Sequence, residues 1–241
     1  MSSPKNKKSW LAKVFQTIPD IVYNHLYISR QGRSEIVKEF HKLYYDSSAF
    51  GKTWKETYWL GTKTWKLPLD LWIYQEILFD TAPDVIIETG TAFGGSAHYL
   101  ACLCDTLKKG RVITIDIEHK EGRPSHPRIE YVLGSSTSEE IAAKVKASIH
   151  PGERVMVILD SDHSQTHVSQ ELKTYASFVS PGCYMVVEDS NMNGHPVYPE
   201  WGPGPMEALV DFLKENKDFE IDESREKLIL TFNPSGYLRK T

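Results

Sequence analysis

Apolar residues gather in short runs along the middle of the chain, and each run ends at a polar or glycine-rich turn. Runs rich in β-branched residues predict buried strands over 84–89, 111–117, 128–134, 154–160, 183–189 and 227–232. Helical spacing of apolar residues predicts helices over 96–109, 138–149, 164–178 and 206–216. Strands that alternate with helices indicate an α/β fold, doubly wound around a mostly parallel sheet that is buried on both faces.

The first part of the chain has a different pattern. Apolar residues at helical spacing with polar faces over 34–47 predict a helix. Pro68 followed by Asp70 predicts a loop that leads into a second helix over about 70–80. We expect residues 1–57 to form an N-terminal helical extension and residues 58–241 to form the Rossmann-like domain. The aromatic residues of the extension exceed what one sheet domain needs for cover, which predicts a homo-oligomer.

Composition excludes several classes of protein. The 241 residues are 40% apolar and 25% charged, as in ordinary globular domains. The formal net charge of −4 argues against nucleic acid as a partner. No apolar run is long enough to span a bilayer, no secretory signal is visible, and three cysteines lack metal-binding spacing. We expect a cytoplasmic protein with no membrane partner.

A glycine-rich turn follows the first predicted strand of the sheet. Gly90 and Gly94 would let a ligand approach the backbone, and the helix that follows offers free N–H groups. The next strand ends in Asp116, an acceptor suited to a ribose diol. Together they indicate an adenosine-containing cofactor, although Ala92 breaks the GxGxxG spacing of dinucleotide sites. A tight turn beside a surface Asp is the alternative.

Acidic residues end two further strands. Asp160 follows one, and Glu188 and Asp189 follow the other. Carboxylates gathered at one sheet edge repel unless protonated or bridged by a cation, and oxygen ligands favour Mg²⁺, Ca²⁺ or Mn²⁺. His163 is close enough along the chain to accept a proton there. Helix capping by Asp160 and Asp189 is the alternative, but it leaves the doubled acid unexplained.

Other candidates carry less information. His195 stands in a long, Pro-rich loop, where it is either a lid residue or simply solvated. Tryptophans could form the floor of a substrate pocket, although core or subunit packing accounts for most of them. They are Trp54, Trp59, Trp65 and Trp72.

Five segments in this order resemble a known family. They are LGTKTWKLPLDLWIYQEIL, IETGTAFGGSA, LDSDHS, VVEDSNMNGHPV and GPGPMEAL, and the resemblance covers roughly residues 57–232. The pattern is similar to class I S-adenosylmethionine-dependent methyltransferases, and within them to the metal-dependent O-methyltransferases that include catechol O-methyltransferase. More specifically, it resembles the cephalosporin hydroxylase family, whose relatives include rhamnosyl O-methyltransferases and macrolide methyltransferases.

The resemblance implies a seven-stranded sheet and methyl transfer from S-adenosylmethionine to a hydroxyl of a sugar or polyhydroxylated natural product, with Mg²⁺ or, as alternatives, Mn²⁺ or Ca²⁺. It implies metal ligands at Asp160, Glu188 and Asp189, and catalytic roles for Asp160 and for His163, where catechol O-methyltransferase uses lysine. The positions it implies for cofactor binding are Glu88, Gly90, Gly94, Ser96, Asp116, Ser135, Ser136 and Asp160.

Three other functions compete with methyl transfer as interpretations of the sequence. An NAD(P)-dependent oxidoreductase would leave the three strand-end acids without a use. A non-catalytic member of the family would bind cofactor or sugar without turnover. The family name suggests hydroxylation, but the sequence shows no set of two His and one carboxylate of the kind that binds iron in hydroxylating enzymes.

Overall fold

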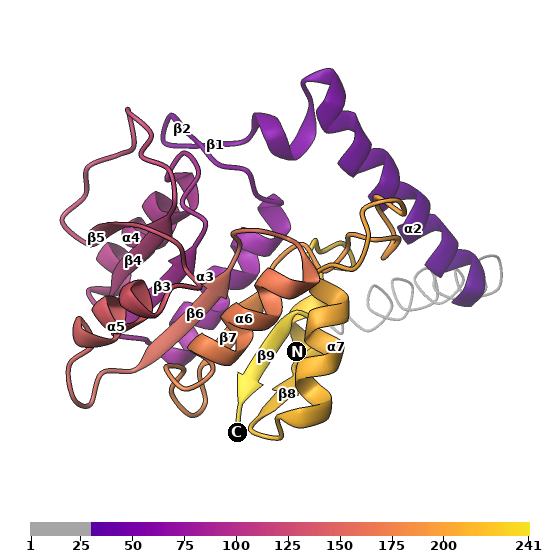
Figure 1. The fold of residues 1–241 in the computed structure, drawn as a ribbon. Coiled ribbons are helices and arrows are strands. Elements are labelled where there is room, and N and C mark those ends of the chain that lie inside the picture. Colours follow the sequence, from indigo (N-terminus) through magenta and orange to yellow (C-terminus); the bar gives the residue numbers. More distant parts are fainter. Residues whose placement is uncertain (1–29) are drawn as a thin grey trace, which may run out of the picture. The chain divides into compact units, whose positions relative to one another are not determined.

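The computed structural model describes residues 30–241 (Figure 1). Contacts within the chain divide it into Met1–Phe40 and His41–Thr241. The expected end of the helical extension at residue 57 stays a prediction, and residues 1–29 of that extension lie outside the described residues. Its described part is helical, as predicted. It comprises α2 (Arg30–Asp46), η1 (Ser47–Phe50) and η2 (Thr53–Glu56).

A seven-stranded sheet forms the centre of the second unit, in the order β5-β4-β3-β6-β7-β9-β8. Its first five members are parallel neighbours, whereas β9 pairs antiparallel with both β7 and β8. The strands are β3 (Val85–Thr89), β4 (Arg111–Asp116), β5 (Ile129–Leu133), β6 (Val155–Leu159), β7 (Tyr184–Val187), β8 (Phe219–Ile221) and β9 (Tyr237–Lys240). A separate hairpin joins β1 (Tyr58–Trp59) to β2 (Thr62–Lys63).

Helices cover both faces of the sheet. The helices are α3 (Pro68–Thr81), α4 (Gly95–Leu107), α5 (Glu139–Ala147), α6 (Gln165–Tyr175) and α7 (Pro205–Glu215), with a short η3 (Glu223–Glu226). One core cluster joins α3 and α4 to the sheet, and another joins α5, α6 and α7 to its opposite face. None of the helices over residues 30–241 is long and apolar enough to cross a bilayer.

Strand periodicity explains this layering. Val85 and Ile87 of β3 belong to the cluster with α5–α7, whereas Ile86 between them belongs to the cluster with α3 and α4. Every residue of β3 is buried, so the strand had to be apolar on both sides. The predicted doubly wound, mostly parallel seven-stranded sheet is confirmed.

The predicted strand over 227–232 is wrong. Ile229 has a left-handed backbone (φ 75°) and is 70% exposed, while Leu230 and Phe232 pack into a third apolar cluster. The residues form a loop, because Thr231 donates a hydrogen bond to the buried Asp70 instead of facing a neighbouring strand. The last two strands are β8 and β9, of which β8 has only one buried residue.

Gly90 fixes the turn after β3. Its φ is +86°, and a Cβ atom there would lie 1.8 Å from the carbonyl oxygen of Asp160. The turn therefore passes directly against the backbone that leaves β6. Both the left-handed conformation and the close approach require glycine at this position.

We expect Gly90→Ala to lower the free energy of unfolding by more than about 3 kcal/mol, because the backbone of two strand ends must move apart. Gly122→Ala is the matched control, since Gly122 has a similar φ of +80° and open space around it. Its loss should be about 1–2 kcal/mol, from the left-handed conformation alone. Urea denaturation measures both, and equal losses would contradict the steric argument.

Candidate functional site

A cavity of about 720 Å³ lies at the carboxyl ends of the parallel strands. Ligands of α/β sheets bind at this edge, and the volume lies in the range of small-molecule sites. Residues at or just after the ends of successive strands line it, including Gly90, Asp116, Gly134, Asp160 and Asp189. The strand ends that the sequence singled out thus meet in one cavity.

The glycine-rich turn forms one wall. Gly90 and Ser96 line the cavity, and Gly94, with φ +79°, begins helix α4. Below them Glu88 is fully buried and accepts a hydrogen bond from Thr114 at 2.6 Å. Its other oxygen, Oε1, has no hydrogen-bond partner among the described residues. Burial raises the pKa of Glu88 to about 7.

Asp116 lies beside this turn, as predicted for a strand-end acid. Its Oδ2 accepts hydrogen bonds from the backbone N–H of Ala92 at 2.9 Å and from Arg123 at 2.7 Å. Its Oδ1 accepts from the N–H of Glu118. Arg123 thus pairs with the carboxylate that the sequence analysis assigned to ribose binding. A ribose diol that bound to Asp116 would have to replace the guanidinium as hydrogen-bond donor to this oxygen.

Serine hydroxyls line another region of the cavity. Ser136 lies within 3.2 Å of His167 Nε2, and Ser161 within 3.0 Å of the same nitrogen. Ser161 also donates to Glu171, which is fully buried and raises the pKa of His167 by hydrogen bonding. Ser135 lines the cavity next to them. A histidine–glutamate pair on α6 therefore fixes the hydroxyls in this region.

Three potential metal ligands meet in the cavity wall. Asp160, His163 and Asp189 each offer one atom, and these atoms lie within 4.8 Å of one another. His163 Nε2 is 3.3 Å from Asp189 Oδ2. Burial raises the pKa of Asp160 and of Asp189. Two carboxylates and one imidazole at one point form a donor set for a divalent cation.

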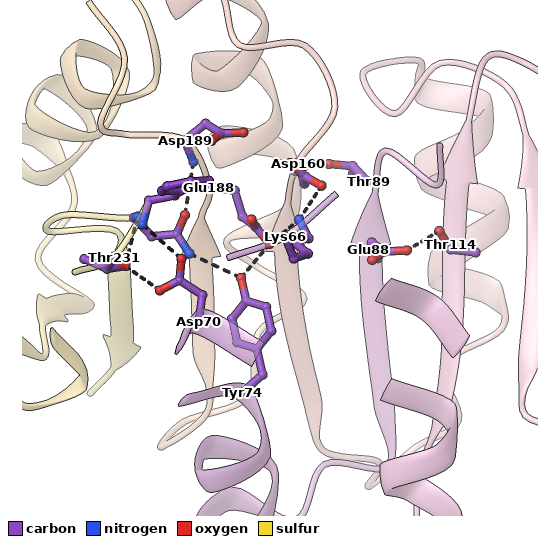
Figure 2. Close-up of polar contacts among 12 residues, drawn as sticks. Lys66, Asp70, Tyr74, Glu88, Thr89, Thr114, Asp160, Glu188, Asp189 and Thr231 are labelled. Carbon is purple, nitrogen blue, oxygen red and sulfur yellow. Dashed lines mark hydrogen bonds and ion pairs between the residues drawn. The ribbon is translucent and has the colours of Figure 1, made fainter. Parts of the chain in front are cut away.

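Glu188 is placed differently from the prediction. Its Oε1 accepts a hydrogen bond from Tyr74 at 2.5 Å and pairs with Lys66 Nζ at 2.6 Å, behind the cavity wall (Figure 2). The same ammonium lies 2.5 Å from Asp160 Oδ2. Asp189 has a left-handed φ of 53°, so the two neighbouring carboxylates leave the chain in different directions.

Lys66 supplies the positive charge that offsets the carboxylates of Asp160 and Glu188. Burial lowers its pKa, but the nearby carboxylates of Asp160 and Glu188 outweigh burial, so the pKa rises and the ammonium stays charged. Sequence reasoning missed this residue because a single lysine outside the strand ends has no chemical pattern. Its one signal was its position within a segment that carried the family resemblance.

A buried acid holds the supporting elements together. Asp70 on α3 accepts hydrogen bonds from Thr231, Tyr237 and the N–H of Phe232. Burial raises its pKa to about 7. These contacts tie the C-terminal loop to α3, from which Tyr74 reaches Glu188.

Some of the remaining candidate residues from the sequence line the cavity, and others lie outside it. Trp54 and Trp65 line the cavity, whereas Trp59 packs edge-on against Tyr99 and Trp72 is 60% exposed. His195 pairs with Glu207 of α7 at 2.9 Å and does not line the cavity. Tyr198 and Trp201 of the same long loop do line it, although the sequence analysis did not single them out.

Comparison with known proteins identifies the family of the chain. The family model for rhamnosyl O-methyltransferase/CmcI matches residues 51–241. The rhamnosyl O-methyltransferase of Mycobacterium tuberculosis (strain ATCC 25618 / H37Rv) is 40% identical over 211 residues, which are 84% of each chain. The one of Mycobacterium leprae (strain TN) is 40% identical over 210 residues, 84% of this chain and 90% of that one.

Solved structures show the same fold. The CmcI-N160 apo-structure has a TM-score of 0.61 at 20% identity, over 78% of this chain and 77% of that one. The cmcI-D160 structure with Mg and SAM has a TM-score of 0.58 at 19% identity, with the same coverage. Since the family model spans most of the chain and the relatives are 40% identical, the chain belongs to the rhamnosyl O-methyltransferase/CmcI family.

Proposed function

We propose that the protein is a Mg²⁺-dependent O-methyltransferase that uses S-adenosylmethionine to methylate a hydroxyl of a sugar or polyhydroxylated natural product. One observation carries the proposal. A single cavity holds both a glycine-rich turn with its acidic partner Asp116 and the group formed by Asp160, His163 and Asp189. Family membership and the rhamnosyl O-methyltransferase relatives support it.

The cofactor end fits S-adenosylmethionine. Glu88 is buried below the turn of Gly90 and Gly94, its Oε1 lacks a hydrogen-bond partner among the described residues, and its charge would attract the positively charged amino group. Asp116 would accept from the ribose, and Ser135 and Ser136 would border the adenine. S-adenosylmethionine supplies the activated methyl group when bound. The role of the chain is to orient it toward the acceptor.

The donor set fits Mg²⁺. This cation binds proteins through one or two carboxylates and keeps its other positions for water or substrate, as the oxygens of Asp160 and Asp189 would allow. A bound Mg²⁺ would lower the pKa of an acceptor hydroxyl and orient two neighbouring oxygens. Glu188 would act from behind the wall by holding Lys66 against Asp160.

His163 is the proposed base. Its side chain is 23% exposed at the cavity, and its Nε2 already faces the carboxylate of Asp189. A proton accepted from the hydroxyl would make an imidazolium that this carboxylate stabilises. The backbone oxygen of His163 also accepts a hydrogen bond from the indole of Trp201 at 3.2 Å, which ties the base to the long loop.

Aromatic rings suit a sugar acceptor. Trp54, Trp65, Tyr198 and Trp201 line the cavity beside the proposed metal position. Flat apolar rings can cover the C–H face of a pyranose while the carboxylates face its hydroxyls. The homo-oligomer, the cytoplasmic location and the absence of a nucleic-acid partner remain part of this proposal.

Incubation with S-adenosylmethionine, Mg²⁺ and a panel of rhamnosides and other glycosides tests the function directly. Mass spectrometry should detect one added methyl group on a hydroxylated acceptor and S-adenosylhomocysteine in equal amount. Binding of NAD⁺ in place of S-adenosylhomocysteine in calorimetry would contradict the proposal.

We expect the affinity for S-adenosylhomocysteine to rise roughly tenfold between pH 6 and pH 8. The pKa of Glu88 is about 7 in the free protein, so its carboxyl is mainly neutral at pH 6 and charged at pH 8. The charged form attracts the ligand's amino group, and affinity therefore rises with pH. Calorimetry measures this, and the rise should be absent in Glu88→Gln. An equal rise in that variant would rule out Glu88 as the cause.

Asp116→Ala should weaken S-adenosylhomocysteine binding by roughly 1.5–3 kcal/mol, because a charged acceptor for the ribose is lost. Asp105→Ala is the matched control, since its carboxylate also pairs with an arginine, Arg128, but outside the cavity. Its affinity should match that of the wild type. Equal affinities in both variants would remove Asp116 from the cofactor site.

Asp160→Asn should abolish methyl transfer while S-adenosylhomocysteine still binds, because the carboxylate serves the metal and the acceptor. Asp162→Asn, whose carboxylate accepts from the N–H of Ser164, should keep its activity. EDTA should inactivate the wild type, and Mg²⁺ should restore it. Full activity after exhaustive chelation would contradict the metal role.

His163→Gln separates the base from the metal. The rate should fall roughly 10²–10⁴-fold while Mg²⁺ still binds, because the proton acceptor is lost but both carboxylates remain. Partial recovery at high pH would agree with this, since hydroxide can then remove the proton. Loss of Mg²⁺ binding in this variant would instead make His163 a metal ligand.

A further inference from the structure

A lysine ammonium occupies the position between two acids at the strand ends. Lys66 Nζ lies 2.5 Å from Asp160 Oδ2 and 2.6 Å from Glu188 Oε1, with only 4% of its side chain exposed (Figure 2). The side chains of Asp160 and Glu188 are 18% and 4% exposed. A charge buried this deeply is retained where its partners neutralise it.

Asp160 is shared between two kinds of partner. It contacts Lys66, and it also belongs to the group with His163 and Asp189 that can hold a divalent cation. Two positive charges beside one partly buried carboxylate repel each other more strongly than they would in bulk water. A carboxylate oxygen already bonded to an ammonium is also a poorer ligand.

We propose that Lys66 is an internal counter-cation that competes with the divalent metal for Asp160 and thereby limits metal affinity. This inference rests on the proposed function, in which Asp160 holds Mg²⁺. Lys66 is a positioning residue in this scheme, since it acts through the carboxylates that it holds.

The surrounding contacts make Lys66 a fixed part of the site. Glu188 is held from its other side by the hydroxyl of Tyr74, which donates to the same oxygen at 2.5 Å. Lys66 stands one residue before buried Leu67, which precedes α3, so the backbone on that side is anchored in the core. The ammonium keeps Glu188 paired and away from the cavity for as long as it stays in place.

Removal of this charge has two opposite consequences. Without the ammonium, Asp160 and Glu188 repel each other, so the metal-free protein should lose stability. The same carboxylates become available to Mg²⁺, so metal affinity should increase. A lysine with a purely structural role would show the first effect without the second.

The test compares Mg²⁺ binding by calorimetry in the full chain and in three variants. Lys66→Met and Lys66→Gln remove the charge, and the glutamine amide still donates to one carboxylate if the methionine variant folds poorly. Lys109→Met is the matched control, because Lys109 pairs with Asp84 instead and does not line the cavity. We expect the dissociation constant for Mg²⁺ to fall roughly tenfold or more in both Lys66 variants and to stay unchanged in Lys109→Met.

Melting temperature gives a second readout that does not depend on activity. Without metal, Lys66→Met should melt roughly 5–20 °C below the wild type. Saturating Mg²⁺ should raise the melting temperature of Lys66→Met more than that of the wild type, because the metal replaces the missing positive charge.

The outcomes separate the two proposals. Unchanged or weaker Mg²⁺ binding in the Lys66 variants, with normal binding in the wild type, would overturn the role of Lys66 and leave the proposed function intact. Mg²⁺ binding in the Lys66 variants but not in the wild type would support the competition, because the ammonium would then exclude the metal from the wild-type protein. No Mg²⁺ binding in any protein would overturn both the metal part of the proposed function and this inference.

Discussion

The contact of one buried lysine with two acids at the strand ends is the interaction on which the rest of the site depends. Parallel strands bring their polar ends to one edge, and Asp160 and Glu188 would repel each other there without a positive charge between them. Lys66 reaches that position because the hairpin of β1 and β2 packs tightly on α4. A Cβ atom on Gly95 would lie 2.2 Å from the carbonyl oxygen of Lys63. The ion pairs of Lys66 therefore link the edge of the sheet to the segment between the hairpin and α3.

Sequence reasoning succeeded where one physical requirement dominated. Strands buried on both faces are largely apolar, so the first three residues of β3 and the whole of β6 were readable as continuous runs. Asp116 and Asp160 followed as the residues at the ends of strands. It failed where the partner is distant in sequence. The loop around Thr231 has an apolar pattern but bonds to Asp70, and Glu188 turns to Lys66, more than a hundred residues earlier. Neither contact leaves a local signal in the chain.

The two ends of the cavity are built from different kinds of structure. The proposed cofactor end consists of strand termini and the turn at Gly90, all fixed by the ladder of the sheet. The proposed acceptor end consists of aromatic side chains from segments outside the sheet, such as Trp54 and Trp201. Substitutions in those segments can change the shape of the acceptor pocket without moving the cofactor. Such a division would let the acceptor specificity change while the scaffold stays the same.

The closeness of Gly90 to Asp160 also bears on how the protein moves. No methyl group fits between the turn at Gly90 and the backbone of Asp160, a proposed metal ligand. Because the two segments are in such close contact, we expect them to move together. The sheet edge contains no hinge at this point. Entry and exit of ligands must then be accommodated by segments outside the strands, such as the loop that carries Tyr198 and Trp201. The groups at these strand ends are thus held in a fixed frame, and adjustment to a ligand falls to the cavity walls around them.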